Sequence, residues 1–383
     1  MIPYGRQHIN QQDIDAVVEV LQSDFLTQGP VVPAFEQRLC ELTTARHAVA
    51  VNSATSALHI ACLALGVGSG SRVWTSPISF VASANCARYC GADVDFVDVE
   101  PDTGNMAIDQ LRQKLELARA NDTLPQVVIP VHLAGTSCDM QQIQYLANEF
   151  GFKIIEDASH AVGATYLGEP VGCGRYSDIT VFSFHPVKII TTAEGGAALT
   201  NHAELADKMR LLRSHGISRD DTVMTEPSHG PWYYQQLVLG LNYRMTDLQA
   251  ALGLSQSQRL LSIIQRRQTL VENYQRLLAN LPISLPSTEK FSTSAWHLYI
   301  IRLTDKARRK TVFNGLRAAG IGVNVHYIPI HTQPYYQQLG FDWGDFPQAE
   351  DFYERIISLP MYPELTSEQQ QFIASNLTKL LDH

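Results

Sequence analysis

Residues 181–196 read VFSFHPVKIITTAEGG, an apolar run followed by a single lysine and a pair of glycines. The apolar run predicts a buried strand that ends near Phe184, and Lys188 follows it among apolar and small neighbours. Most lysines lie at the surface with their stems along apolar groups, and that is the ordinary alternative. An amine in an apolar setting has a lowered pKa, so a neutral, nucleophilic fraction can form an imine. Lys188 is therefore the first candidate catalytic residue.

Around this stretch, short β-branched runs alternate with helical stretches from about residue 45 to about residue 215. This alternation predicts an α/β layer with a mostly parallel sheet, and ligands of such sheets collect beyond the carboxyl ends of the strands. The expected strands are 47–51, 93–97, 126–132, 153–156, 179–184 and 196–200, with helices such as 79–89 and 140–150 between them.

The rest of the chain predicts a second, smaller unit. A polar segment with Gly, Pro and His, roughly 216–240, interrupts the pattern, and an amphipathic stretch over 246–281 predicts one long linking helix. We place the domain boundary near residue 250, which gives a large domain over 1–250 and a small α+β domain over 251–383. Its expected strands are 296–303 and 323–328, and its expected helices are 307–319, 349–357 and 367–381.

Composition limits the class of protein. Hydrophobic residues make up 45% of the 383 positions and charged residues 17%, which predicts a globular protein without disordered tracts. The net charge of −9 gives no general attraction to nucleic acid or to an anionic membrane. No apolar run reaches the length of a membrane span, and the first residues lack the apolar core of a signal peptide. We therefore expect a cytoplasmic protein with neither kind of partner.

The six cysteines contain no Cys-x-x-Cys pair, so the sequence predicts neither a zinc site nor a disulfide framework. They are interpreted as reduced structural thiols. Cys86 and Cys90 stand four apart on an expected helix and could share a face, where core packing is the expected role.

Small and hydroxyl residues open the helix that follows the strand at 47–51. The segment Asn52–His59 reads NSATSALH, and a helix N-terminus with free N–H groups and short side chains can seat a phosphate. The alternative is an ordinary Ser/Thr-capped helix.

Acidic and aromatic residues follow other strands. Asp157 ends the strand at 153–156, where its carboxylate could keep a ring nitrogen protonated, as pyridoxal phosphate needs to act as an electron sink; an N-cap is the alternative. His160 could pack beside the same ring or be a structural histidine. Ser183 precedes Lys188 by five residues and could reach a phosphate, and Phe80 could stack on a planar ring or belong to the core.

The sequence resembles a fold-type I pyridoxal phosphate (PLP) aminotransferase. The resemblance lies in the combination of a phosphate-binding helix start, an acidic residue after one strand and a lysine after another. The segments 156–164 (EDASHAVGA), 182–188 (FSFHPVK), 194–196 (EGG) and 241–247 (LNYRMTD) resemble the DegT/DnrJ/EryC1/StrS nucleotide-sugar aminotransferases over nearly the whole chain. Within that family, 184–192 and 325–331 (VHYIPIH) are most similar to the pseudaminic acid branch.

The resemblance implies roles by position. Lys188 would be the Schiff-base lysine, Asp157 would pair with the pyridine nitrogen, and Ser183 with the Ala54-Thr55 turn would bind phosphate. Asn242 would reach the phosphate from the neighbouring subunit of a homodimer, while many family members carry glutamine at the position of His160. The residues that would border the sugar nucleotide are Tyr4, Leu26, Thr27, Ser56, His326 and Tyr327, each of which could instead be a structural turn or strand edge.

The activity that the resemblance implies is transfer of an amino group from L-glutamate to C4 of a UDP-linked 4-keto-6-deoxy-N-acetylhexosamine. The product would be UDP-4-amino-4,6-dideoxy-N-acetyl-β-L-altrosamine, a precursor of pseudaminic acid, and the cofactor would alternate between PLP and pyridoxamine phosphate (PMP). Three alternatives stay open: another acceptor such as a UDP-4-keto pentose, a sugar dehydratase, and a non-catalytic PLP-binding regulatory protein. Related dehydratases have histidine at the lysine position, so Lys188 argues against that class.

Overall fold

The structure is a computed structural model that describes residues 1–287 and 291–382. At its centre lies a seven-stranded sheet in the order β1-β9-β8-β5-β4-β2-β3. Strand β9 runs antiparallel to both of its neighbours, and the other neighbouring strands are parallel. The strands are β1 His47–Val51, β2 Arg72–Thr75, β3 Asp93–Phe96, β4 Val127–Ile129, β5 Lys153–Asp157, β8 Ile179–Ser183 and β9 Gly196–Thr200. The predicted, mostly parallel sheet is confirmed, and β2 is the strand before Phe80, for which the sequence predicted no bounds.

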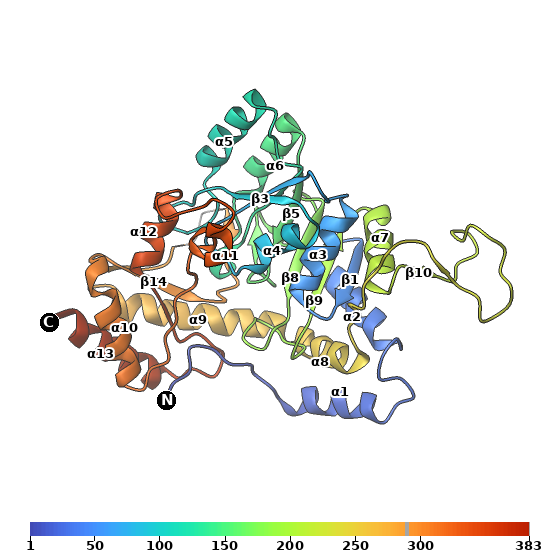
Figure 1. Ribbon diagram of the computed structural model, residues 1–383. Helices are drawn as coiled ribbons and strands as arrows, with labels where there is room; N and C mark the ends of the chain where they lie inside the picture. Colours follow the sequence, from blue (N-terminus) through green and yellow to red (C-terminus); the bar gives the residue numbers. More distant parts are fainter. Residues whose placement is uncertain (288–290, 383) are drawn as a thin grey trace.

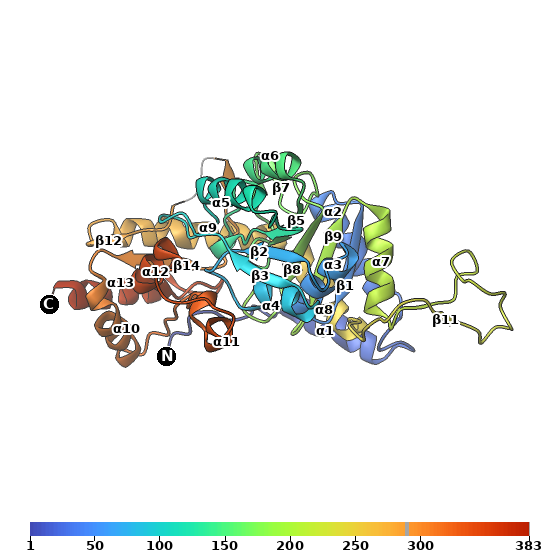
Figure 2. The ribbon, with the colours of Figure 1, turned by 45° about the horizontal axis from the view of Figure 1, so that its top comes forward.

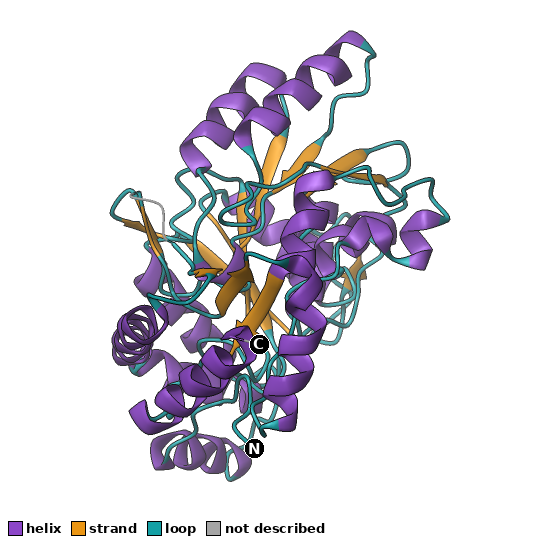
Figure 3. Cartoon of the chain, turned by 90° about the vertical axis from the view of Figure 1, so that its left-hand side faces the viewer, coloured by secondary structure: helices purple, strands orange, loops and turns teal. Residues whose placement is uncertain are grey.

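Helices cover both faces of this sheet, as Figure 3 shows. Successive residues of a strand point to opposite faces, so Val181 packs in the core under α3, α4 and α7, while Phe182 packs with α2 and the start of α9. Strands buried on both faces must be apolar throughout, which explains their continuous Val, Ile and Ala runs. The helices are α2 Val31–Thr43, α3 Ala54–Ala64, α4 Ala82–Tyr89, α5 Ile108–Ala120, α6 Met140–Phe150 and α7 Ala203–Arg213.

The C-terminal part packs around its own core, at the left of Figures 1 and 2. A three-stranded antiparallel sheet has the order β12-β14-β15. The helices and strands of the C-terminal part are β12 Ile283–Ser284, β14 Tyr299–Leu303, η2 Lys306–Arg308, α10 Arg309–Ala318, η3 Ile330–Thr332, α11 Pro334–Gln337, α12 Pro347–Arg355, β15 Ile356–Leu359 and α13 Ser367–Asp382. The smaller α+β unit is thus as predicted.

Three predicted elements in this half were wrong in detail. The expected helix over 246–281 is two helices, α8 Asp247–Gln258 and α9 Leu260–Leu278, because Arg259 between them leaves helical geometry at φ −104°, ψ 7°. The expected strand over 323–328 makes only one isolated bridge, from Asn324 to Ser358. The expected helix over 349–357 ends at Arg355, and the next residues form β15.

Helix α9 connects the two cores. Its first turns, with Leu260 and Ile263, pack against the large sheet, whereas Leu270 and Leu278 pack in the C-terminal core. The N-terminal residue Ile2 also pairs with that core, since its N–H donates to the Gly320 carbonyl at 2.8 Å. We propose that the first residues pack with the small unit, and the boundary near residue 250 stays a prediction.

Smaller elements complete the chain. They are α1 Gln11–Leu21, η1 Leu133–Gly135, β6 Thr165–Tyr166, β7 Glu169–Pro170, β10 Ile217–Ser218, β11 Gln235–Gln236 and β13 Ser292–Thr293. Strands β10 and β11 form the base of a hairpin over the segment 216–240, and this hairpin extends far from the body in both Figure 1 and Figure 2.

Within residues 1–287 and 291–382, no helix is both long and apolar enough to span a bilayer.

The cysteines fit their predicted structural role. All six are free thiols. Cys62 and Cys86 are fully buried in the core between α3, α4 and the sheet, and Cys90 packs at its edge. The expected core packing of Cys86 and Cys90 is confirmed.

Candidate active site

A cavity of about 610 Å³ opens at the carboxyl ends of the central strands. The segment 324–327 from the C-terminal unit closes one side, so both units contribute to the walls. Ten of the residues singled out in the sequence line the cavity: Tyr4, Ala54, Thr55, Phe80, Asp157, His160, Ser183, Lys188, His326 and Tyr327.

Lys188 lies in the loop between β8 and β9, which is closed at its base. The Phe184 N–H donates to the Gly195 carbonyl at 2.9 Å, and the Thr192 N–H donates to the Phe184 carbonyl at 3.0 Å. The Lys188 amine makes no hydrogen bond or ion pair with the described part of the chain. Burial lowers its pKa to about 8, against an opposing effect of the Asp157 carboxylate. An amine with this pKa is roughly one-tenth neutral at pH 7, as a nucleophile or base requires.

Asp157 is held by two hydrogen bonds at the end of β5. The Ser83 hydroxyl of α4 donates to Oδ2 at 2.6 Å, and the Ser159 N–H donates to Oδ1 at 3.1 Å. Ser83 is itself hydrogen-bonded to Ser79 at 2.7 Å. The carboxylate is 5% exposed and lines the cavity, so it can still accept a hydrogen bond from a protonated ligand nitrogen.

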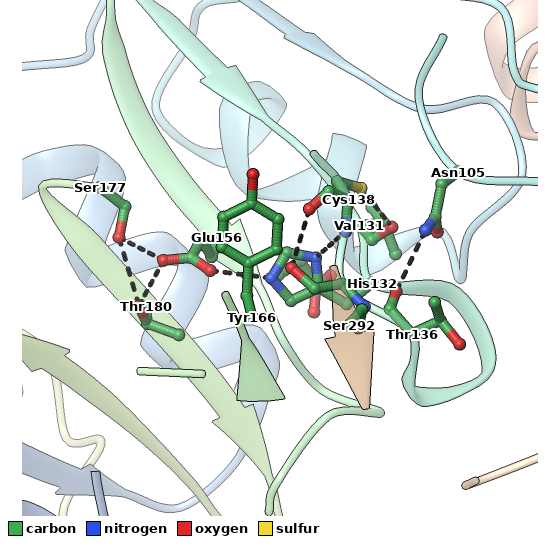
Figure 4. A network of polar contacts seen from close by, with 12 residues as sticks. Asn105, Val131, His132, Thr136, Cys138, Glu156, Tyr166, Ser177, Thr180 and Ser292 are labelled. Carbon is green, nitrogen blue, oxygen red and sulfur yellow. Dashed lines mark hydrogen bonds and ion pairs between the residues drawn. The ribbon is translucent and has the colours of Figure 1, made fainter. Parts of the chain in front are cut away.

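A buried polar network fixes the strand that carries Asp157 (Figure 4). The Cys138 nitrogen lies 3.2 Å from Nδ1 of His132, and Nε2 of the same ring donates to Glu156 at 2.8 Å. Burial would lower the pKa of His132, but its contacts with Cys138 and Glu156 raise it to about 10. Glu156 also accepts hydrogen bonds from Ser177 and Thr180. Burial would raise the pKa of the Glu156 carboxyl, but the hydrogen bonds with His132, Ser177 and Thr180 lower it. The network therefore ties β4 to β5 directly beside the site.

The start of α3 forms one end of the cavity. Ser53 caps the helix by accepting a hydrogen bond from the Ser56 N–H at 3.1 Å. The first N–H groups, at Ala54 and Thr55, have no acceptor within the helix, and both residues line the cavity. A Cβ atom on Gly196 would lie 2.5 Å from the Ala54 nitrogen, so only glycine allows β9 to pass this close. The Ser183 hydroxyl lines the same end and has no hydrogen bond to the described residues. These donors suit an anion such as a phosphate.

Aromatic and imidazole side chains form another part of the cavity wall. His160 and Tyr327 are joined by a hydrogen bond of 3.0 Å, and Phe80 lies 6.4 Å from the Tyr327 ring. His326 packs 5.5 Å from Tyr4 and is hydrogen-bonded to Ser358 at 2.7 Å. Burial lowers the pKa of His326 to about 3, with a further lowering by Lys188, so this imidazole is neutral.

Four predicted residues do not line the cavity of this protomer. Ser56 is buried with its hydroxyl donating to Asn52 at 2.7 Å. Leu26 and Thr27 lie in a loop attached to the start of α8, where the Asp247 N–H donates to the Leu26 carbonyl at 3.0 Å. Asn242 pairs with Ser214 through the backbone. Their binding roles stay predictions.

The structure also brings in residues that the sequence did not point to. Ser83 reaches Asp157 from α4, four residues after Ser79, and this helical spacing was the only signal available. His297 lines the cavity with its Nδ1 buried and without a partner, and its ring lies 4.4 Å from that of His160. His297 comes from the C-terminal unit, so no local motif links it to the site.

The cavity fits a phosphorylated pyridine aldehyde. It combines an amine with a lowered pKa, a buried carboxylate with spare acceptor capacity, and a helix start with free donors. The described residues contain no comparable set of metal ligands, since no group of three or more His, Cys, Asp or Glu side chains is placed to hold an ion.

Comparison with known proteins agrees with this geometry. The model of the DegT/DnrJ/EryC1/StrS aminotransferase family matches residues 7–378. The chain is 40% identical to the spore coat polysaccharide biosynthesis protein SpsC of Bacillus subtilis, over 96% of this chain and 94% of that protein. It is 37% identical to a UDP-4-amino-4,6-dideoxy-N-acetyl-beta-L-altrosamine transaminase of Campylobacter jejuni, over 100% and 98% of the two chains.

A solved structure extends the comparison to the fold. PseC of Helicobacter pylori, an aminotransferase involved in the biosynthesis of pseudoaminic acid, superposes with a TM-score of 0.91 at 34% identity, covering 100% of this chain and 99% of that one.

Proposed function

The chain belongs to the DegT/DnrJ/EryC1/StrS aminotransferase family and is a PLP-dependent sugar aminotransferase of fold-type I, and from this membership we infer its reaction. We propose that it moves an amino group from L-glutamate to C4 of a UDP-linked 4-keto-6-deoxy-N-acetylhexosamine. The 37% identity to the Campylobacter jejuni transaminase along the full chain supports this acceptor, and the cavity that joins Lys188 to Asp157 carries the proposal as a whole.

The residues of the cavity divide the work between them. When bound, PLP supplies an aldehyde that exchanges amino groups and a ring that withdraws electrons. Asp157 would hold the ring nitrogen, and the start of α3 with Ser183 would hold the phosphate. Lys188 is the nucleophile, and its Nζ takes up and returns the proton, because its pKa of about 8 makes both forms accessible near neutral pH. Glutamate leaves as 2-oxoglutarate before the sugar reacts, so the kinetics are ping-pong.

Product identification tests the acceptor. The protein is incubated with glutamate and a panel of UDP-4-keto sugars that differ at C5 or lack C6, and the amino sugar is identified by NMR. We expect amination at C4 of the L-configured 4-keto-6-deoxy-N-acetylhexosamine. Preferred turnover of a UDP-4-keto pentose would replace this acceptor, and cofactor binding without any amine transfer would identify a regulatory protein.

A lysine pair tests the chemistry. Lys188→Ala should abolish transfer, the visible absorbance of bound cofactor and its fixation by borohydride. Lys310→Ala removes an exposed lysine of α10 and should leave all three unchanged. Full transfer by a folded Lys188→Ala protein would remove the proposal.

We also propose a homodimer in which Asn242 completes the partner's site. Asn242 lies off the cavity of its own protomer, and the nearby hairpin exposes apolar side chains, with Trp232 at 73% and Leu239 at 86% exposure. Exposed apolar groups on an extended hairpin are typical of a protein interface.

Mixed dimers test this arrangement. Asn242→Ala and Lys188→Ala proteins are each inactivated and then mixed under conditions that exchange subunits. If Asn242 acts across the interface, each hybrid holds one intact site and activity returns. No recovery despite proven exchange would place Asn242 in its own subunit's site.

The free cysteines further support a reducing, cytoplasmic location.

A further inference from the structure

Three groups in the cavity wall form a hydrogen-bond chain. The backbone N–H of Ala134 donates to Nδ1 of His160 at 3.3 Å. Nε2 of the same ring lies 3.0 Å from the hydroxyl oxygen of Tyr327. The chain thus runs from the turn after β4 through His160 to the segment contributed by the C-terminal unit.

The first contact fixes the direction of the second. Burial lowers the pKa of His160 well below its usual value, and Lys188 lowers it further, so the ring is neutral and has one N–H. Nδ1 accepts a hydrogen bond from an amide and therefore has no proton. The proton lies on Nε2, which donates to the Tyr327 oxygen.

Tyr327 consequently has its own O–H left to donate. Its hydroxyl has no second hydrogen bond to the described part of the chain, and the residue lines the cavity. Burial raises the pKa of Tyr327, with a smaller contribution from Asp157, so the phenol keeps its proton. A partly buried O–H without an acceptor is costly, and a bound ligand can relieve that cost.

The turn that holds His160 is built to present this amide. Ala134 has φ 59°, a conformation that non-glycine residues seldom adopt, and Gly135 follows at φ 105°. A Cβ on Gly135 would lie 2.9 Å from the Trp296 nitrogen and 3.0 Å from the His160 carbonyl oxygen. The neighbouring His297 ring, 4.4 Å away, packs against His160 and restricts its rotation.

We propose that Ala134, His160 and Tyr327 form a one-way hydrogen-bond chain that makes the Tyr327 hydroxyl a donor to an accepting oxygen of the bound ligand. Tyr327 is then a ligand-binding residue whose hydroxyl always donates its hydrogen bond to the ligand, and His160 is a positioning residue that acts through it. The inference rests on the proposed function for the identity of the ligand. The accepting oxygen belongs either to the cofactor ring or to the sugar, and the chemistry is the same in both cases.

The direction of the chain can be measured without any ligand. Histidine ring nitrogens are observed by ¹⁵N NMR in the wild-type protein, and the His160 signals are assigned by their loss in His160→Gln. We expect a neutral ring with its proton on Nε2. A proton on Nδ1 of His160, or a charged ring at pH 7.5, would overturn the proposal.

Four variants test the consequence for binding. Tyr327→Phe keeps the ring and loses the donor. His160→Gln keeps one acceptor and one donor, because its side-chain carbonyl can accept from the Ala134 N–H and its amide can donate to the Tyr327 oxygen. His160→Leu has neither group. Tyr145→Phe is the matched control, because it removes the hydroxyl of an exposed tyrosine of α6 that does not line the cavity. Cofactor affinity and spectrum are measured first, then affinity of the PMP-loaded protein for a UDP-sugar by calorimetry.

The two binding measurements separate the possible acceptors. Tyr327→Phe should weaken one of them by about ten- to a hundredfold. A loss in the cofactor titration with a spectral shift places the acceptor on the cofactor, and a loss confined to the UDP-sugar places it on the sugar. His160→Leu should lose a similar amount, and His160→Gln should recover most of it.

Two results would refute the chain. Unchanged affinities for both ligands in Tyr327→Phe would show that the hydroxyl donates to neither. A full loss in Tyr327→Phe with none in His160→Leu would show that His160 does not direct it. If the wild-type protein binds no cofactor at all, the proposed function fails, whereas the NMR measurement still decides the direction of the chain.

Discussion

Replacing Gly196 with alanine should damage the cofactor site and the fold together. The new Cβ atom would lie 2.5 Å from the Ala54 nitrogen, 2.6 Å from the Ala54 Cα and 2.6 Å from the Ser53 carbonyl carbon. All three are backbone atoms at the start of α3, so no side-chain rotation relieves the clash. Strand β9 and the helix start must separate by about 1 Å to restore ordinary contact distances of 3.5 Å or more.

The cost follows from this displacement. Forcing one extra carbon into a packed interior costs about 1–3 kcal/mol, and more where backbone has to move. We expect a loss of about 3 kcal/mol in the free energy of unfolding. The same shift moves the N–H groups of Ala54 and Thr55, so affinity for PLP should fall at least about tenfold, equivalent to about 1.4 kcal/mol.

The assay compares urea unfolding of the cofactor-free protein and the absorbance titration with PLP. Gly68→Ala is the matched control, because its new Cβ would have nothing within 4 Å and its backbone is not in the left-handed region. That control should match the wild type in both measurements. Wild-type stability and PLP affinity in Gly196→Ala would refute the close approach of β9 to α3 as the reason for this glycine.

Other consequences can be tested in the same way. Lys188→Met should stabilise the cofactor-free protein by about 1–3 kcal/mol at pH 7. Because burial lowers the Lys188 pKa from 10.5 to about 8, the advantage in urea unfolding should shrink as pH rises between those values, and a constant difference would contradict the burial. Ser83→Ala should reduce PLP affinity about tenfold while changing stability by less than about 1.5 kcal/mol, with Ser262→Ala, an exposed serine of α9, as a control that binds normally. Glu156→Leu should cost about 3–5 kcal/mol in unfolding free energy, because His132, Ser177 and Thr180 lose a shared buried acceptor; a cost below about 1 kcal/mol would show that the network does not support β5.

The sequence predicted the parts of the fold whose pattern is local. Long apolar runs such as 179–184 appear as strands because both faces of the sheet are covered. The amphipathic pattern that begins at Thr246 gave the start of α8, where the structure shows a capping box between Thr246 and Gln249. Strand β2 was noted only as a strand-like run before Phe80 and was given no bounds, because Arg72–Thr75 is short, follows glycine- and serine-rich residues and ends two residues before Pro77.

Tertiary contacts decided where the predictions failed. The segment 323–328 has alternating apolar residues, but it pairs with β15 at Asn324 alone and then turns into the cavity. Helix α12 ends at Arg355 because Ile356 and Ile357 complete a sheet with β14, a partner more than fifty residues earlier. Periodicity carries no information about such distant pairing.

The candidate site followed a similar division. The positions of Lys188, Asp157 and the Ala54-Thr55 turn in the cavity could be predicted, because each lies at the carboxyl end of a recognisable strand or within five residues of it. The direction of the bond between His160 and Tyr327 could not, since it depends on the amide of Ala134 in a third segment. Ser83 was nearly as hidden, because its four-residue spacing from Ser79 does not indicate the Asp157 carboxylate to which it donates.

The loop that carries Lys188 leaves one strand and enters the strand beside it, and the two are hydrogen-bonded to each other where the loop begins and ends. The base of this loop is therefore fixed to the central sheet, and the amine of Lys188 reaches the cavity at the end of four methylene groups. Under the proposed function, Lys188 would release the cofactor and return to it in each turnover. Because the base of the loop is hydrogen-bonded to the sheet, this return would need only rotation about the single bonds of the Lys188 side chain.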